Sequence, residues 1–174
     1  MAPSVPRAYI DTMLFVYKLA NPSHRLFRKS DAFFLDVAAK TYIGVTTTFI
    51  HAEYRSVVKT LISRSQGSSA TQSAVDNDVA TLDKFLKKMG IELYNADVVA
   101  DSAPLTIFYR AEQLIAAANS VKGWNGKWRT IGGADALGVA LAELVKANLF
   151  ATCDQAFKGL SGTSVKPLMV SEVY

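Results

Sequence analysis

The sequence is poor in cysteine and histidine, which excludes several classes of protein. Its single cysteine, Cys153, cannot form an internal disulfide, and a lone cysteine fits a reducing compartment better than a secreted protein. The chain has only two histidines, too few to complete an ordinary zinc site. One of them, His51, is two residues from Glu53, so on a helix the two side chains would point in different directions.

Long apolar runs are also missing. The N-terminal residues MAPSVPRAYID lack the apolar stretch of a signal peptide, and no segment approaches the length needed to cross a bilayer. Half of the 174 residues are nevertheless hydrophobic, enough for one sizeable core. We therefore expect a single cytoplasmic domain over residues 1–174. Because only 20% of residues are charged, we also expect a second subunit to cover one face, as in a homodimer.

Strand-like and helix-like segments alternate along the chain. Short runs rich in β-branched and aromatic residues predict strands at residues 8–10, 41–47, 91–95, 149–152 and 165–170. Helical patterns follow at residues 12–17, 26–39, 48–61, 75–89, 104–119 and 134–147, with Pro104 opening one of them. Residues 63–74 are predicted to form a loop or a frayed helix end, and residues 121–133 an irregular basic segment. This alternation predicts an α/β fold, a three-layer α/β/α sandwich with a mainly parallel sheet of about five strands.

Four of the fifteen acidic residues lie where a predicted strand ends or where the following helix begins: Asp11, Glu53, Asp135 and Asp154. In a parallel sheet these positions share one edge, so the four carboxylates are expected to be neighbours. Carboxylates that lie this close to one another require a compensating cation, and oxygen ligands favour Mg²⁺ or Mn²⁺ over zinc.

Each acid taken alone also has a simpler interpretation. An acid in the first turn of a helix is often only a partner of the helix dipole, which would account for Asp135. Asp135 also shares a polar stripe with Lys146 and could face solvent. The joint placement of four acids favours the metal site.

Three segments resemble the motifs of PIN domains. AYIDTMLFVY is similar to the opening of that family, in which an Asp ends the first strand and a Thr follows. TTTFIHAEYRSVVKTL is similar to its second motif, a threonine-rich strand end that leads to a helical Glu. GGADALGVALAELVKANLFATCDQAF resembles the third and fourth motifs together. The matches occur in the order of the family and span most of the chain.

The resemblance implies a PIN-like nuclease that hydrolyses RNA phosphodiester bonds with Mg²⁺ or Mn²⁺. Its catalytic and metal-binding quartet would be Asp11, Glu53, Asp135 and Asp154, with Thr152 as the hydroxyl residue beside the last acid. Met13 stands where Ser or Asn is frequent, and Gly138 where many members have His, so the finer substrate contacts differ. The family includes toxins of toxin–antitoxin pairs, which implies a small antitoxin partner; the extra length and the Ser-rich and Trp-rich segments are instead compatible with a stand-alone nuclease.

A basic and aromatic segment precedes Asp135 and contains Lys122, Trp124, Lys127, Trp128 and Arg129. If exposed, it could stack RNA bases and hold phosphates. The interpretation that we favour for the indoles themselves is packing onto the core or onto a second subunit, because large aromatics mostly bury their area. With four acids neutralised by cations, 19 basic residues would face 11 acids, a balance that suits RNA.

Two alternatives remain open from the sequence. A PIN-like module could bind RNA or protein without cutting it, although the intact acids argue against this. A receiver-like signalling domain could use Asp11 as a phosphoacceptor, but the expected second acid beside Asp11 is missing.

Overall fold

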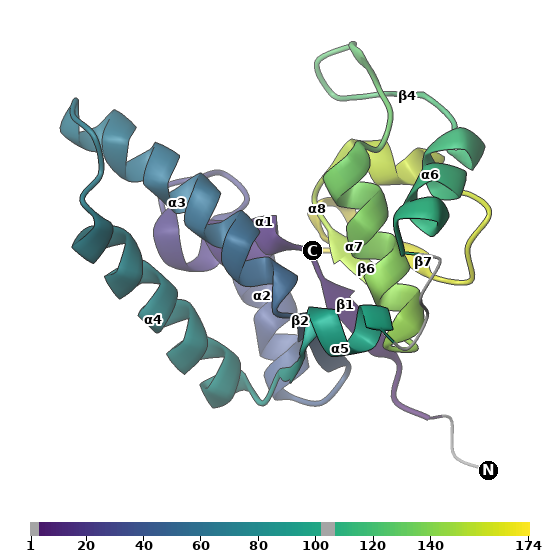
Figure 1. Cartoon of the computed structure of the whole chain (residues 1–174), viewed down its shortest axis with the longest axis horizontal. Coiled ribbons are helices and arrows are strands. Elements are labelled where there is room, and N and C mark those ends of the chain that lie inside the picture. Colours follow the sequence, from purple (N-terminus) through teal and green to yellow (C-terminus); the bar gives the residue numbers. More distant parts are fainter. Residues whose placement is uncertain (1–3, 102–106) are drawn as a thin grey trace.

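A five-stranded parallel sheet forms the centre of the protein in a computed structural model that describes residues 4–101 and 107–174. Its strands are β1 (Arg7–Ile10), β2 (Ile43–Thr47), β3 (Glu92–Tyr94), β6 (Leu149–Thr152) and β7 (Lys166–Met169). Their spatial order is β3-β2-β1-β6-β7, and helices lie on both faces (Figure 1). The predicted α/β/α sandwich is confirmed.

Successive residues of the central strand face two separate apolar cores. Ala8 and Ile10 belong to one core and Tyr9 to the other, as the two-residue period of a strand requires. The neighbouring β6 divides in the same way, because Phe150 packs with Tyr9 and Ala151 with Ile10. Both faces of the sheet are therefore covered, which explains the nearly continuous apolar runs of these strands.

The first face is covered by α1 (Thr12–Phe15), a π-helical segment η1 (Val16–Ala20), α2 (Phe27–Ala38), α3 (Phe49–Gln66), α4 (Gln72–Met89) and α8 (Val170–Val173). The second face is covered by α6 (Ile107–Ala117) and α7 (Gly133–Leu144), with α5 (Ala96–Asp101) and the 3₁₀ helix η2 (Gln155–Gly159) beside them. The predicted helix start at Pro104 lies outside the described residues.

Helices α3 and α4 form a long antiparallel pair on one side of the sheet (Figure 1). The segment at 63–74, expected to be a loop or a frayed helix end, contains the last turn of α3 up to Gln66 and a loop at residues 67–71; the expectation is wrong only at its end, since α4 begins at Gln72. The Thr71 side chain accepts a hydrogen bond from the Ala74 amide and caps α4. Each helix is 18 residues long, yet no helix in the described part of the chain is both long and apolar enough to cross a membrane.

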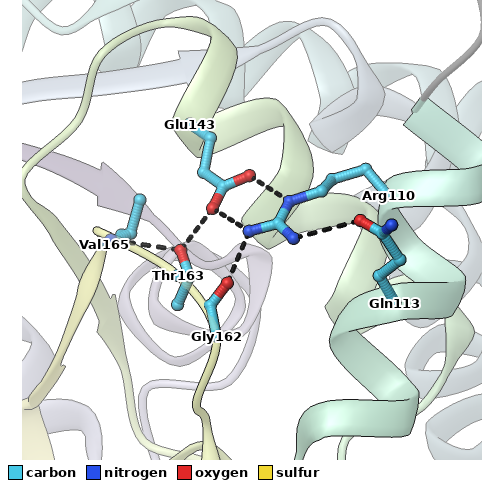
Figure 2. Close-up of polar contacts among 6 residues, drawn as sticks. All are labelled: Arg110, Gln113, Glu143, Gly162, Thr163 and Val165. Atoms are coloured by element: carbon cyan, nitrogen blue, oxygen red, sulfur yellow. Dashed lines mark hydrogen bonds and ion pairs between the residues drawn. The ribbon is translucent and has the colours of Figure 1, made fainter.

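On the other side of the sheet, an ion pair joins α6 to α7. Arg110 donates Nε and Nη2 to the two carboxylate oxygens of Glu143, at 2.8 and 2.7 Å. The Thr163 hydroxyl also donates to Glu143, and the Gly162 carbonyl accepts from Arg110, as Figure 2 shows. These contacts connect both helices to the loop that precedes β7.

Residues 121–133, expected to be irregular, contain a short antiparallel hairpin of β4 (Val121–Lys122) and β5 (Trp128–Arg129). Gly126 takes a positive φ of 73° in its turn, a conformation that glycine adopts without strain. At the base of the hairpin, the Asn119 amide donates to the Gly159 carbonyl at 2.8 Å. The hairpin is thereby attached to η2, the segment that follows Asp154.

Candidate active site

The four predicted acids all lie at the carboxyl edge of the sheet or on the helices that begin there. Asp11 follows β1 directly, and its amide donates to the Ala151 carbonyl of the neighbouring β6 at 3.0 Å. Asp154 follows the end of β6, Glu53 lies in the second turn of α3, and Asp135 lies in the first turn of α7. The order of the strands brings together residues that are up to 143 positions apart in the sequence.

Thr152 links the two acids that follow strands. Its buried hydroxyl donates to Oδ2 of Asp11 at 2.5 Å and accepts from the Asp154 amide at 3.0 Å. The other oxygen of Asp11 accepts from the Met13 amide at 3.1 Å, which makes Asp11 the N-cap of α1. The Asp11 carboxylate is therefore held from two sides.

Glu53 is held by a second threonine. The Thr12 hydroxyl, which is 6% exposed, donates to Oε2 of Glu53 at 2.5 Å. Thr12 is thus the link between α1 and α3 at this edge. Below it, the hydroxyls of Tyr9 and Thr47 share a hydrogen bond of 2.9 Å.

The remaining two acids also contact backbone amides. Oδ2 of Asp135 accepts from the Gly132 amide at 2.8 Å, as an acid in the first helical turn often does. Oδ1 of Asp154 accepts from the Ala156 amide at 2.9 Å and lies 3.7 Å from Nη1 of Arg129. Asp135 therefore does act as a partner of the N-terminus of α7 through Oδ2, and its Oδ1 takes no part in that hydrogen bond.

Three of the four acids line one small cavity of about 20 Å³, which is room for about one water molecule: Asp11, Glu53 and Asp135. Its apolar wall includes Phe150 and Phe157. Asp154 instead lines a larger neighbouring pocket of about 420 Å³.

Burial raises the pKa of three of the acids, and their mutual repulsion adds to it. For Asp11, burial and the charges of Glu53 and Asp135 outweigh the hydrogen bonds that it accepts and raise its pKa to about 7. The pKa of Glu53 is raised by burial and by the charge of Asp135. That of Asp135 is raised by burial and by the charge of Asp154. Each of these repulsions between carboxylates favours the binding of a proton or a cation at this edge of the sheet.

The donor set fits a hard cation in kind, because it supplies carboxylate and hydroxyl oxygens. Among residues 4–101 and 107–174, however, no three acidic, histidine or cysteine side chains are arranged to hold one metal ion directly. Three acids are turned toward a threonine hydroxyl or a backbone amide. The arrangement therefore suits a Mg²⁺ or Mn²⁺ ion that keeps part of its water shell. Direct coordination by three acids would require these side chains to move on binding.

The basic segment is exposed, so packing of the two tryptophans onto the core is wrong, and packing onto a second subunit stays a prediction. Trp124 is 52% exposed and Trp128 is 72% exposed. Only part of the segment reaches the acids: Trp124 and Arg129 line the larger pocket together with Asp154. Lys122 and Lys127 are exposed on the hairpin.

Sequence reasoning missed three residues of the larger pocket, Tyr17, His24 and Arg25. They lie in the π-helical segment and in the turn after it, where no motif marked them. The other histidine, His51, points away from the acids and pairs with Asp83 on α4 at 2.8 Å. An aromatic and basic cluster soon after the first acid was the signal that could have identified the three.

Comparison with solved structures shows a likeness of fold. No family model matches the chain, and no curated protein matches it. A chain from the crystal structure of VapBC2 from Rickettsia felis, bound to a DNA fragment from their promoter, superposes with a TM-score of 0.56. The likeness covers 92% of this chain and 97% of that chain at 16% sequence identity. It shows that the fold is the PIN-like α/β/α arrangement.

Proposed function

We propose that the chain is a metal-dependent endoribonuclease whose catalytic and metal-binding residues are Asp11, Glu53, Asp135 and Asp154. The observation that carries the proposal is the gathering of these four acids at one edge of the sheet, where Asp11, Glu53 and Asp135 line one cavity and repulsion among the acids adds to the raised pKa values of these three. Acids with no function are rarely gathered in this way, because each raises the free energy of ionising the next.

A Mg²⁺ or Mn²⁺ ion bound there would neutralise charge on the phosphate and lower the pKa of an attacking water. The residues of the chain have separate roles in this proposal. Asp11, fixed by Thr152 and Met13, is the most firmly positioned acid. Glu53 and Asp135 line the small cavity together with it, and Asp154 lines the larger pocket. Thr152 positions two of the acids and is not itself catalytic.

RNA is the proposed substrate because basic side chains lie beside the acids. Arg129 contacts Asp154 and lines the larger pocket with Trp124. Lys122 and Lys127 are exposed beside them on the hairpin, and Trp128 lies outside that pocket. Such a segment can hold phosphates and stack bases next to a site that hydrolyses the phosphodiester.

The test is cleavage of single-stranded RNA with Mn²⁺ and with chelator. We expect Mn²⁺-dependent cleavage that is reduced at least a hundredfold in Asp11→Asn, Glu53→Gln and Asp154→Asn. Asp97→Asn, which neutralises an exposed acid on α5, is the matched control and should retain activity. Equal activity in all four proteins would refute the assignment of the acids.

A second candidate is a PIN-like module that binds RNA or protein without cutting it. The observation in its favour is that no three acids in the described residues are arranged to hold a metal directly. Tight RNA binding with no cleavage in Mg²⁺ or Mn²⁺ would favour this candidate.

The proposed biological role is that of a toxin with a small antitoxin partner, supported by the PIN-like fold that the chain shares with a VapBC2 structure. Expression of the chain alone should arrest the growth of a bacterial host, and co-expression with the adjacent gene should restore growth.

We also propose a homodimer, because Phe108 and Tyr109 of α6 are 78% and 57% exposed.

A further inference from the structure

The larger pocket lies beside the acids and is formed by three segments that are distant in the sequence. Its volume is about 420 Å³, within the range of pockets that bind small ligands. Its lining includes residues from η1 and the turn after it, from the β4–β5 hairpin and from the turn after β6: Tyr17, His24, Arg25, Trp124, Arg129 and Asp154.

Flat side chains form the walls of this pocket. The rings of Tyr17 and His24 are stacked, with centroids 4.3 Å apart and an angle of 8° between their planes. The guanidinium carbon of Arg25 lies 4.9 Å from the ring centroid of Trp124. Aromatic rings and guanidinium planes are the surfaces on which proteins stack unpaired bases.

The charges of the pocket leave a positive excess that suits a phosphate group. Arg25 and Arg129 supply two positive charges from two different segments, against the one negative charge of Asp154, which lies 3.7 Å from Arg129. Burial and the charge of Arg25 lower the pKa of His24, which favours the neutral form of the ring that stacks on Tyr17. Asp154 belongs both to this lining and to the proposed quartet, so a nucleotide here would be next to the acids.

We propose that this pocket is a subsite for one unpaired nucleotide of single-stranded RNA, with its base among the aromatic side chains and a phosphate between Arg25 and Arg129. The inference rests on the proposed ribonuclease function and adds a strand preference to it. A base in a duplex is stacked and paired, so it would have to leave the helix before it could enter a concave pocket. Single-stranded RNA can present the base without that unfavourable step.

The two tryptophans of the chain make the test specific, because only Trp124 lines the pocket. In chelator, a single-stranded RNA oligonucleotide should quench the fluorescence of Trp128→Phe, in which Trp124 remains. It should leave Trp124→Phe, in which Trp128 remains, nearly unchanged. The same oligonucleotide annealed to its complement should quench neither protein at equal concentration.

Affinity for a labelled oligonucleotide supplies a second readout. Trp124→Ala should weaken binding about tenfold, whereas Trp128→Ala, at the more exposed indole outside the pocket, should change it less than twofold. Arg25→Ala should likewise weaken binding, with Arg28→Ala, which removes the same charge from an exposed position three residues later, as its control.

Each outcome bears on one proposal. Quenching of Trp128 instead of Trp124, equal binding of duplex, or equal effects of each variant and its control would overturn the nucleotide subsite. Cleavage that depends on the four acids would still stand in that case. Selective binding at Trp124 without Mn²⁺-dependent cleavage would support the subsite and remove the nuclease function.

Discussion

At the scale of single residues, the Thr152 hydroxyl makes the two hydrogen bonds that set Asp11 and Asp154 relative to each other. Its role could be predicted from the sequence only in part. The alternation of apolar strands and helices was enough to place Asp11 and Asp154 at strand ends. The hydrogen bond between Thr152 and Asp11, which are 141 residues apart, could not be predicted from this alternation, because it depends on which strands are neighbours in the sheet.

Replacement of Thr152 by Val should leave the Asp11 carboxylate and the Asp154 amide each without one partner. We expect a loss of roughly 1–3 kcal/mol in unfolding free energy and a larger fall in cleavage rate than in RNA affinity. Thr152→Ser retains the hydroxyl and should restore most of the activity. Denaturant unfolding and single-turnover cleavage would measure both effects, and a Ser variant as impaired as the Val variant would contradict the positioning role.

The raised pKa of Asp11 predicts how the stability of the metal-free protein changes with pH. Its pKa is about 7 when folded and near the ordinary 3.8 when unfolded. Between pH 4 and 7 the folded protein keeps a proton that the unfolded chain has released, so unfolding free energy should fall as pH rises. Asp11→Asn lacks this group and should be more stable than the native chain at pH 8, by roughly 1 kcal/mol or more.

Urea unfolding at pH 5 and pH 8 in chelator would measure this difference, with Asp97→Asn as the control. In saturating Mn²⁺ the order should reverse, because only the native chain then gains the full binding free energy. The same stability difference at both pH values would show that Asp11 is not a buried, repelled carboxylate.

At the scale of elements, the sequence did not predict helix ends or contacts between distant segments. Residues 63–66 and 72–74 are polar and small, with no strong helical pattern, yet they form the end of α3 and the start of α4, between the left-handed Gly67 and the capping Thr71. The π-helical segment at Val16–Ala20 has no sequence signature of its own. The pocket beside Asp154 depends on the contact of that region with the hairpin at 121–129, which pattern analysis does not reach.

Gly159 fixes the position of this hairpin. A Cβ atom at Gly159 would lie 1.9 Å from the Asn119 carbonyl oxygen, which is backbone and cannot move aside cheaply. Gly159→Ala should therefore lower the unfolding free energy by about 2 kcal/mol or more. Gly133→Ala, where an added Cβ meets nothing within 4 Å, is the control. Equal thermal midpoints for the two variants would refute the role of this contact.

At the scale of the whole molecule, the exposed side chains of α6 bear on the proposed homodimer. Phe108 is 78% exposed, and Ile115 and Leu137 lie near it in an apolar depression that Ala111 also lines. Light scattering should give the mass of a dimer for the native chain and of a monomer for Phe108→Ser. Leu35→Ser, at a 63% exposed apolar position on α2, should remain dimeric. A native chain that is monomeric at all concentrations would exclude the dimer.

The most direct test of the account is calorimetric titration of Mn²⁺ into the native protein and into four variants that each neutralise one acid. If one cation is shared by the quartet, Asp11→Asn, Glu53→Gln, Asp135→Asn and Asp154→Asn should each weaken binding about tenfold or more. Asp97→Asn should bind as the native chain does. Mn²⁺ affinity that is absent in the native protein, or unchanged in all four variants, would contradict the shared metal site.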